Sequence, residues 1–434
     1  NHIFAYDNSV LSQNYNHESD IRYVTKYNSW ILTSIGIWPS MLEGSGRFLP
    51  FAAILLGNSA LCFAVAPCAL HIVYEEKDIT MKLKLFGLLG YCVMAMIKYC
   101  SFALRRPEIK KCIEEVKADW KLVVIHEDRE VMLRYAKIGR RLTIICATFM
   151  YSGGLIYHML PCLQYYFNKI GDEDNHTVNL LVYPTYTALF DAQKSPVYEL
   201  VYTSHCICGY FLYSITVGAC GLAALFATHT CGQVDIVISR LNDLVKGNYA
   251  ESNSSPEKRL TAIVQHHLRI LRFSAMIEKI LQEVCLVEFV GSTVIICLLE
   301  YYCITEWESN NALTFTTYVI LLISLTFNIY ILCYIGELLM EKTGSIGKSC
   351  FMIDWYQLPT TTIRELILII LISGNPVKIT AGKMVDLTLA TFGNVIFLQL
   401  PNPCRIINFA QRTVQKKVYY SLLITKGHYL FAGS

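Results

Sequence analysis

Charged residues are scarce in this sequence: Asp, Glu, Lys and Arg make up 16% of its 434 residues, while hydrophobic residues make up 54%. A soluble domain carries about a quarter charged residues, because its surface must be solvated. The net charge is only +3 and the chain has no basic tract, so nucleic acid is not expected as a partner. This composition predicts a protein whose surface faces a lipid bilayer.

Catalytic and metal-binding motifs are also lacking. The sequence contains no P-loop, no zinc-protease helix and no nucleophile elbow. It has 17 cysteines, but the connections predicted to lie outside the cell hold almost none, which excludes a disulfide framework. Cys206 and Cys208 are two positions apart on a predicted helix, so their side chains point to different sides. We therefore expect no catalytic residue, no metal site and no cofactor.

Long apolar runs dominate the sequence instead. Six of them are near or above the ~20 residues that a helix needs to cross ~30 Å of hydrocarbon; they cover residues 48–74, 85–104, 142–167, 201–230, 285–303 and 312–335. A seventh candidate, residues 385–400, is short and carries Asp386. Because only helices satisfy their own backbone groups in lipid, the predicted fold class is all-α, an integral membrane bundle of seven transmembrane helices.

Basic residues lie in alternate connections and predict the orientation of the bundle. The second, fourth and sixth connections hold eleven, seven and five Lys and Arg residues, at residues 105–141, 231–284 and 341–383. Positive charge marks cytoplasmic connections, so the amino terminus also lies inside, an inverted topology. Residues 107–140 are rich in helix formers and predict one long helix that continues beyond the membrane.

The predicted chain is organised in four parts along the sequence. They are a cytoplasmic amino-terminal segment (1–47), spans one to six with cytoplasmic helical extensions (48–340), a cytoplasmic helical anchor with the start of span seven (341–396), and an atypical tail (397–434). In this orientation the sequon at Asn175 lies outside, where it can be glycosylated. The sequon at Asn253 lies inside and is expected to stay unmodified.

A G-protein-coupled receptor does not fit this pattern. Its topology is the reverse of the one predicted here. The nearest match to its third-helix motif, Asp128-Arg129-Glu130, lies within a polar connection. Neither Asn375-Pro376 nor Asn402-Pro403 is followed by the tyrosine of the seventh-helix motif.

Several short motifs resemble those of another seven-helix family. In chain order they are Asn28-Ser29-Trp30, Gly36-Ile37-Trp38-Pro39, Cys333-Tyr334-Ile335-Gly336-Glu337-Leu338, Asp354-Trp355-Tyr356-Gln357-Leu358-Pro359, Thr380-Ala381-Gly382-Lys383 and Leu387-Thr388-Leu389-Ala390-Thr391-Phe392. Each motif is short, but their order and spacing together resemble the insect odorant receptors. The resemblance covers residues 20–396.

The resemblance implies a function. Members of this family assemble with a shared co-receptor into a tetramer that forms an odorant-gated cation channel, in which the last helix of each subunit lines the pore. The chain lacks the long insertion of the co-receptor, so it resembles a ligand-tuning subunit in the plasma membrane of olfactory dendrites. Two alternatives stay open at this point. One is a gustatory-type chemoreceptor of shared architecture, and the other is a transporter, although no repeated halves are visible.

Both ends of the chain depart from the expected pattern. The first residue is Asn1 rather than methionine, so we expect the amino end to be incomplete. After Ile396 the family continues with an uninterrupted helix, whereas this chain has Pro401 and Pro403 followed by basic residues. Proline in a helix interior costs about 3 kcal/mol or more. We therefore expect residues 397–434 to come from a read-through or a wrong exon and not to line a pore. The alternative is a divergent but genuine terminus.

The resemblance places the binding site for a small volatile organic ligand between spans two and six, in the outer half of the membrane. Apolar and aromatic residues predicted at that depth are the candidate contacts: Tyr91, Tyr151, Gly154, Tyr157, His158, Tyr202, Phe315 and Tyr318. Each aromatic residue could equally serve helix packing or an interfacial belt. Lys98, near the inner end of its span, is expected to extend toward the lipid headgroups.

Overall fold

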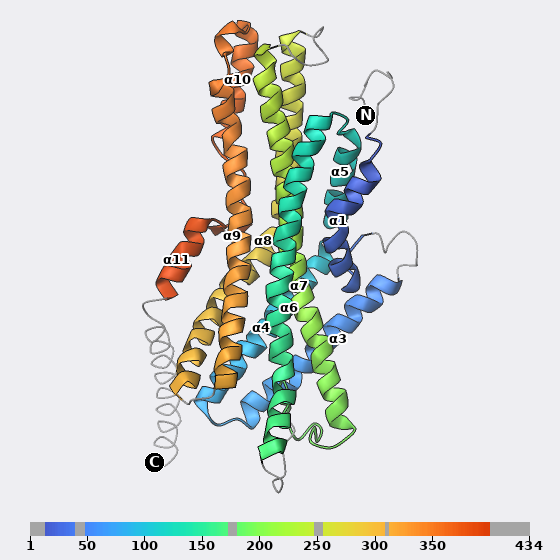
Figure 1. The fold of residues 1–434 in the computed structure, drawn as a ribbon, viewed down its shortest axis with the longest axis vertical. Coiled ribbons are helices and arrows are strands. Elements are labelled where there is room, and N and C mark those ends of the chain that lie inside the picture. Colours follow the sequence, from blue (N-terminus) through green and yellow to red (C-terminus); the bar gives the residue numbers. More distant parts are fainter. Residues whose placement is uncertain (1–13, 40–47, 172–179, 247–254, 309–311, 400–434) are drawn as a thin grey trace, which may run out of the picture.

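The computed structural model describes residues 14–39, 48–171, 180–246, 255–308 and 312–399, almost all of them helical (Figure 1). The sequons predicted at Asn175 and Asn253, and the tail from residue 400 onward, lie outside the described residues. The elements are α1 (His17–Ser34), α3 (Phe48–Tyr74), α4 (Ile79–Leu104), α5 (Arg106–Leu122), α6 (His126–Gly171), α7 (Val197–Lys246), α8 (Pro256–Glu308), α9 (Ala312–Met352), η1 (Trp355–Gln357), α10 (Thr360–Ser373), β1 (Thr380–Ala381), β2 (Val385–Asp386) and α11 (Leu389–Gln399).

Six helices in the described part of the chain are long and apolar enough to cross a membrane, and they contain the six predicted spans: α3, α4, α6, α7, α8 and α9. Where the seventh span was expected, the structure has a short hairpin followed by α11. Asp386 lies in that hairpin, where its carboxylate is 2.6 Å from the Lys378 ammonium. Helix α11 therefore begins after Asp386, the charged residue within the predicted seventh span.

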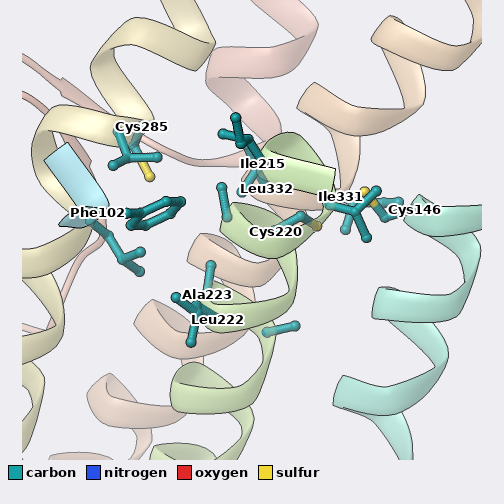
Figure 2. Close-up of a cluster of buried hydrophobic side chains, with 14 of the residues drawn as sticks. Phe102, Cys146, Ile215, Cys220, Leu222, Ala223, Cys285, Ile331 and Leu332 are labelled. Atoms are coloured by element: carbon teal, nitrogen blue, oxygen red, sulfur yellow. The ribbon is translucent and has the colours of Figure 1, made fainter. Parts of the chain in front are cut away.

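Helix α7 forms the centre of the bundle. Every residue from 211 to 234 is buried, as expected for a helix that is apolar all round. Helices α6, α8 and α9 pack along it, with α1 and α3 against its remaining sides. Figure 2 shows Phe102 of α4, Cys146 of α6, Cys285 of α8 and Leu332 of α9 gathered around this part of α7. The hydrophobic core is thus built around one helix that is shielded from lipid.

The prediction of a single helix over residues 107–140 is wrong. The structure has two helices, because α5 ends at Leu122 and α6 begins at His126. Val123, Val124 and Ile125 lie between them, and such β-branched residues are weaker helix formers than the straight-chain residues around them. The break lets α5 turn back against α8 and bury Trp120.

The two ends of the bundle differ in what they carry. One end, called the anchor end below, holds α5 and α10 (Figure 1). There α10 packs on α9 and α8, around a second buried cluster that includes Val234, Leu260, Ile346 and Leu366. The opposite end, called the loop end, holds the 180–196 loop between α6 and α7, together with the turn between α3 and α4.

Candidate ligand pocket

A cavity of about 510 Å³ lies at the loop end, between α4, α6, α7, α8, α9 and the 180–196 loop. This volume is within the ~300–1,000 Å³ of typical small-molecule sites. Its wall is mostly apolar and aromatic. The lining residues include Tyr91, Met150, Gly154, Tyr157, Tyr183, Leu212, Tyr213, Tyr302, Tyr318 and Leu325.

The 180–196 loop folds into the bundle and supplies one wall of the cavity. Val182 and Tyr183 are buried, with exposed fractions of 6% and 2%. The Tyr183 ring meets the His205 ring edge to face, with ring centres 4.9 Å apart. Phe190 stacks on Phe63 of α3, with ring centres 6.1 Å apart. These buried side chains anchor the loop, which closes one side of the cavity.

Hydrogen bonds tie the same loop to the end of α3. The Glu75 carboxylate accepts hydrogen bonds from both the backbone N–H (3.0 Å) and the hydroxyl of Thr187. The hydrogen bond from the Thr187 side chain lowers the pKa of Glu75 below its ordinary value. His71, which also lines the cavity, lies 2.7 Å from the same carboxylate through Nδ1. These contacts fix the loop over the cavity.

A glycine determines the shape of the deeper wall. A Cβ placed on Gly154 would collide with the ring of Tyr213, and both residues line the cavity. The absence of a side chain on α6 therefore lets the Tyr213 ring of α7 lie directly against the α6 backbone. Any larger residue at this position would push an aromatic ring, and so change the shape of the space left for a ligand.

Four of the eight residues predicted as ligand contacts line this cavity: Tyr91, Gly154, Tyr157 and Tyr318. They come from three helices, α4, α6 and α9, and the fold brings them to one space. Tyr318 also contacts Tyr302 of α8, with ring centres 5.5 Å apart. Contact between these four residues and a ligand stays a prediction. It requires that they line one cavity, and they do.

The other four lie outside the wall of the cavity. The Tyr151 hydroxyl is 2.8 Å from the Ser214 hydroxyl, and Tyr202 donates to the His158 carbonyl at 2.8 Å. His158 is buried against α7, with Nδ1 3.0 Å from the Gly154 carbonyl. Phe315 packs on Trp307, with ring centres 5.4 Å apart. These aromatic residues pack between helices. Helix packing is one of the two other roles that the sequence analysis allowed for them.

The expectation that Lys98 extends to the headgroups is wrong. Its side chain is 0% exposed and forms an ion pair with Glu288 of α8, which is 1% exposed. Glu288 also accepts hydrogen bonds from Asn328 of α9 at 2.6 Å and from Ser292 at 3.0 Å. The lysine finds its partner inside the bundle, because α4 and α8 pack side by side.

Two groups of residues at this site were missed by the sequence analysis. Residues of the 180–196 loop carry no periodic pattern that would predict insertion into a bundle. Glu288 did carry a signal, because an ionisable residue within a span is a functional candidate by default. Within the described ranges, no group of three or more His, Cys, Asp or Glu residues could hold a metal ion.

The described helices thus form a bundle of membrane-spanning length around an apolar cavity of small-molecule size, which defines a multi-pass membrane protein. Residues 79–398 match the family model described as 7tm odorant receptor. That match covers well over half of the chain, and the chain belongs to the odorant receptor family.

Similar proteins occur among the insect odorant receptors. Odorant receptor 13a of Drosophila melanogaster is 25% identical over 256 residues, 56% of this chain and 60% of that protein. Odorant receptor 10 of Aedes albopictus is 21% identical over 232 residues, and the chain again spans 60% of its length. Putative odorant receptor 92a of D. melanogaster is 22% identical over 316 residues, 71% of this chain and 74% of that protein.

The fold is that of a solved insect olfactory receptor. The structure of receptor OR5 of Machilis hrabei superimposes with a TM-score of 0.71 at 15% identity and covers 89% of this chain and 98% of that one. The structure of the same receptor in complex with eugenol gives a TM-score of 0.70 at 13% identity. The predicted class, an all-α membrane bundle of the seven-helix kind, is confirmed.

Proposed function

We propose that this chain is the ligand-tuning subunit of an odorant-gated cation channel, which assembles with a co-receptor and detects volatile chemicals at the plasma membrane of olfactory neurons. The observation that carries the proposal is the cavity of about 510 Å³ at the loop end, lined mainly by aromatic and aliphatic side chains. Volatile odorants are small and mostly apolar, and burial of apolar surface supplies about 25 cal/mol per Å². A mostly apolar cavity of this volume suits such ligands.

The proposed ligand contacts are the residues that the fold brings to the cavity. Tyr91, Gly154, Tyr157 and Tyr318 form its wall together with Leu212 and Leu325. Tyr151, His158 and Tyr202 support that wall through hydrogen bonds between α6 and α7. In this proposal the loop end faces outward and the anchor end faces the cytoplasm, as the basic residues of the connections predict.

Helix α9 offers a physical connection from the cavity to α11. Tyr318 and Leu325 line the cavity, and Tyr330 on the same helix contacts Phe392 of α11, with ring centres 5.4 Å apart. Further along, the Glu337 carboxylate accepts a hydrogen bond from the backbone N–H of Leu389 at 3.2 Å, the first residue of α11. A shift of α9 on ligand binding would move the start of α11, and we propose that a last helix continuing without interruption beyond Ile396 lines the pore.

Co-expression with an insect co-receptor in cultured cells tests the proposal. Two forms should be compared: the chain as given, and a chimera whose terminus after Ile396 comes from Odorant receptor 13a, because Pro401 and Pro403 depart from the family pattern. We expect odorant-evoked cation currents from the chimera with the co-receptor. Surface expression of the chimera without any current across a broad panel of volatiles would contradict the assignment, and current without the co-receptor would contradict the proposed assembly.

A further inference from the structure

A chain of polar contacts leads from the centre of the bundle to the wall of the cavity. Lys98 of α4 forms the buried ion pair with Glu288, whose other oxygen is held by Ser292 and Asn328. The Lys98 ammonium also lies 2.9 Å from the hydroxyl oxygen of Thr216 on α7. That hydroxyl is 3.4 Å from the phenolic oxygen of Tyr91, which lines the cavity. Four helices, α4, α7, α8 and α9, thus contribute to one network.

The direction of the hydrogen bond between Lys98 and Thr216 is fixed by the ammonium group. An ammonium group has three N–H donors and no acceptor, so the Thr216 oxygen must accept from Lys98. The Thr216 side chain is 1% exposed, and its own proton needs an acceptor, because a buried O–H without one is costly. Besides Lys98, the partner that the structure describes for this hydroxyl is the oxygen of Tyr91.

The opposite direction leaves a group unsatisfied. If Tyr91 donated its proton to Thr216, the Thr216 proton would have no acceptor among the described residues, inside a part of α7 that is buried on all sides. If Thr216 donates to Tyr91, the buried Thr216 proton has its acceptor. The phenolic O–H of Tyr91 is then not used within the network. Tyr91 is partly exposed and lines the cavity.

We propose that the Lys98–Glu288 ion pair, acting through Thr216, makes Tyr91 a hydrogen-bond donor toward the cavity, and that the receptor therefore selects ligands with an acceptor oxygen. The inference rests on the proposed function, since it requires the ligand to occupy this cavity. Tyr91 is the specificity-determining residue, while Lys98 and Thr216 are positioning residues. The favoured chemical class is ketones, esters and ethers, in preference to hydrocarbons of the same shape.

Ligand pairs that differ in a single group test this selection. Acetophenone and α-methylstyrene have nearly the same shape, but a carbonyl oxygen in the first is a CH₂ group in the second. Aliphatic methyl ketones and the corresponding alkenes extend the series. Binding to the purified full-length chain in lipid nanodiscs should favour the ketone by about three- to tenfold, the range of one net neutral hydrogen bond. The measured quantity is the ratio of the two dissociation constants, which a general loss of folded protein does not change.

Variants of the network should change that ratio in a defined way. Tyr91→Phe should bring it close to one by weakening ketone binding alone. Thr216→Val should lower it, while the matched control Thr216→Ser, which keeps the hydroxyl, should preserve it. Lys98→Met alone would leave Glu288 unpaired in the core, so the double variant Lys98→Met with Glu288→Gln is the test of the ion pair. We expect it to lower the ratio as Tyr91→Phe does.

The possible failures are distinguishable. Equal affinity of the wild-type chain for both members of each pair would overturn this inference and leave the proposed receptor function standing. An unchanged ratio in Tyr91→Phe, or in the double variant, would also overturn it. If the folded wild-type chain bound no member of any pair, the cavity would not be a ligand site, and the proposed function would fail together with the inference.

Discussion

Lys98 and Glu288 are separated by 190 residues in the sequence, yet their side chains form an ion pair that is 0% and 1% exposed. A second ion pair between the same two helices, Lys84 with Glu306, is more accessible, at 20% and 9%. Removing a charge from water is unfavourable by several kcal/mol, and only a well-placed partner offsets this. Both pairs join a lysine of α4 to a glutamate of α8. Comparing them therefore measures how burial changes the contribution of an ion pair to stability.

We predict that Lys98→Met destabilises the fold by about 3–5 kcal/mol, because it leaves the Glu288 carboxylate buried without its counter-ion. Adding Glu288→Gln should recover much of the loss, since an amide keeps a hydrogen-bonding side chain beside Asn328 and Ser292 but carries no charge. Thermal unfolding of the detergent-solubilised protein, followed by the fraction that stays monodisperse, measures both effects.

Lys84→Met is the matched control. Both side chains of this pair are more exposed than those of the buried pair, at 20% and 9%, so the loss should be smaller than for Lys98→Met. If Lys98→Met lowered the stability no more than Lys84→Met, the unpaired Glu288 carboxylate would not carry the expected cost of burial.

The membrane spans could be predicted from the sequence, but the pairing of Lys98 could not. Span prediction depends only on local composition, because lipid demands about 20 successive apolar residues. The partner of a buried lysine depends on which helices become neighbours, and that information is not local. The position of Lys98 near one end of its apolar run predicts contact with the headgroups, whereas the packing of α4 on α8 places it beside Glu288.

The ligand site was predictable to the extent that its residues lie on spans. The family resemblance places the site in the outer half of the membrane, and depth within the spans then selects Tyr91, Gly154, Tyr157 and Tyr318, which line the cavity. Depth does not say which face of a helix turns inward, so residues at similar depth, such as Phe315, pack elsewhere. The wall made by the 180–196 loop was not predictable at all, because its insertion depends on contacts with α3 and α7.

A second prediction concerns Gly154. An alanine there would collide with the Tyr213 ring, and such overpacking typically costs about 1–3 kcal/mol. The displaced ring would also reduce the space in the cavity, so affinity should fall more for large ligands than for small ones. Gly90→Ala is the control, because a Cβ at Gly90 meets nothing within 4 Å. Dissociation constants for a homologous ligand series measure the effect, and an equal loss for small and large ligands would argue against a change in cavity shape.

A third prediction concerns pH and the 180–196 loop. The hydrogen bond from Thr187 lowers the pKa of Glu75 below its ordinary value of 4.5, so the loop contact favours the ionised carboxylate. The stabilisation it gives is present above pH 4.5 and is lost as the pH falls through the lowered pKa. Hydrogen exchange of residues 183–192, corrected for intrinsic rates, should therefore increase selectively in that acidic range.

Two variants separate the groups that meet at this carboxylate. Glu75→Gln should make exchange of the loop faster at neutral pH and remove its dependence on acid. His71 lies on the same carboxylate and is 3.9 Å from Glu76 through Nε2, so His71→Gln shows how much of the profile belongs to the imidazole. A profile that is unchanged in Glu75→Gln would exclude this carboxylate as the titrating group.

The last prediction separates ligand binding from conduction. A Cβ on Gly336 of α9 would collide with the backbone carbonyl oxygen of Leu387, which cannot rotate away as a side chain can. Gly336→Ala should therefore displace the start of α11 and weaken the hydrogen bond between Glu337 and the Leu389 N–H. Because the cavity lies at the other part of α9, ligand affinity should stay near the wild-type value while current from the co-expressed chimera falls.

Gly344→Ala, two turns further along α9, is the control for a general effect of the added methyl group. A Cβ at Gly344 would meet Pro376 at 3.5 Å, an ordinary contact distance, so both binding and current should be preserved. Hydrogen exchange of residues 387–399 gives an independent reading, and it should increase in Gly336→Ala alone. If Gly336→Ala left the current intact despite faster exchange at α11, the packing of α11 on α9 would not be needed for gating, and the connection proposed along α9 would be wrong.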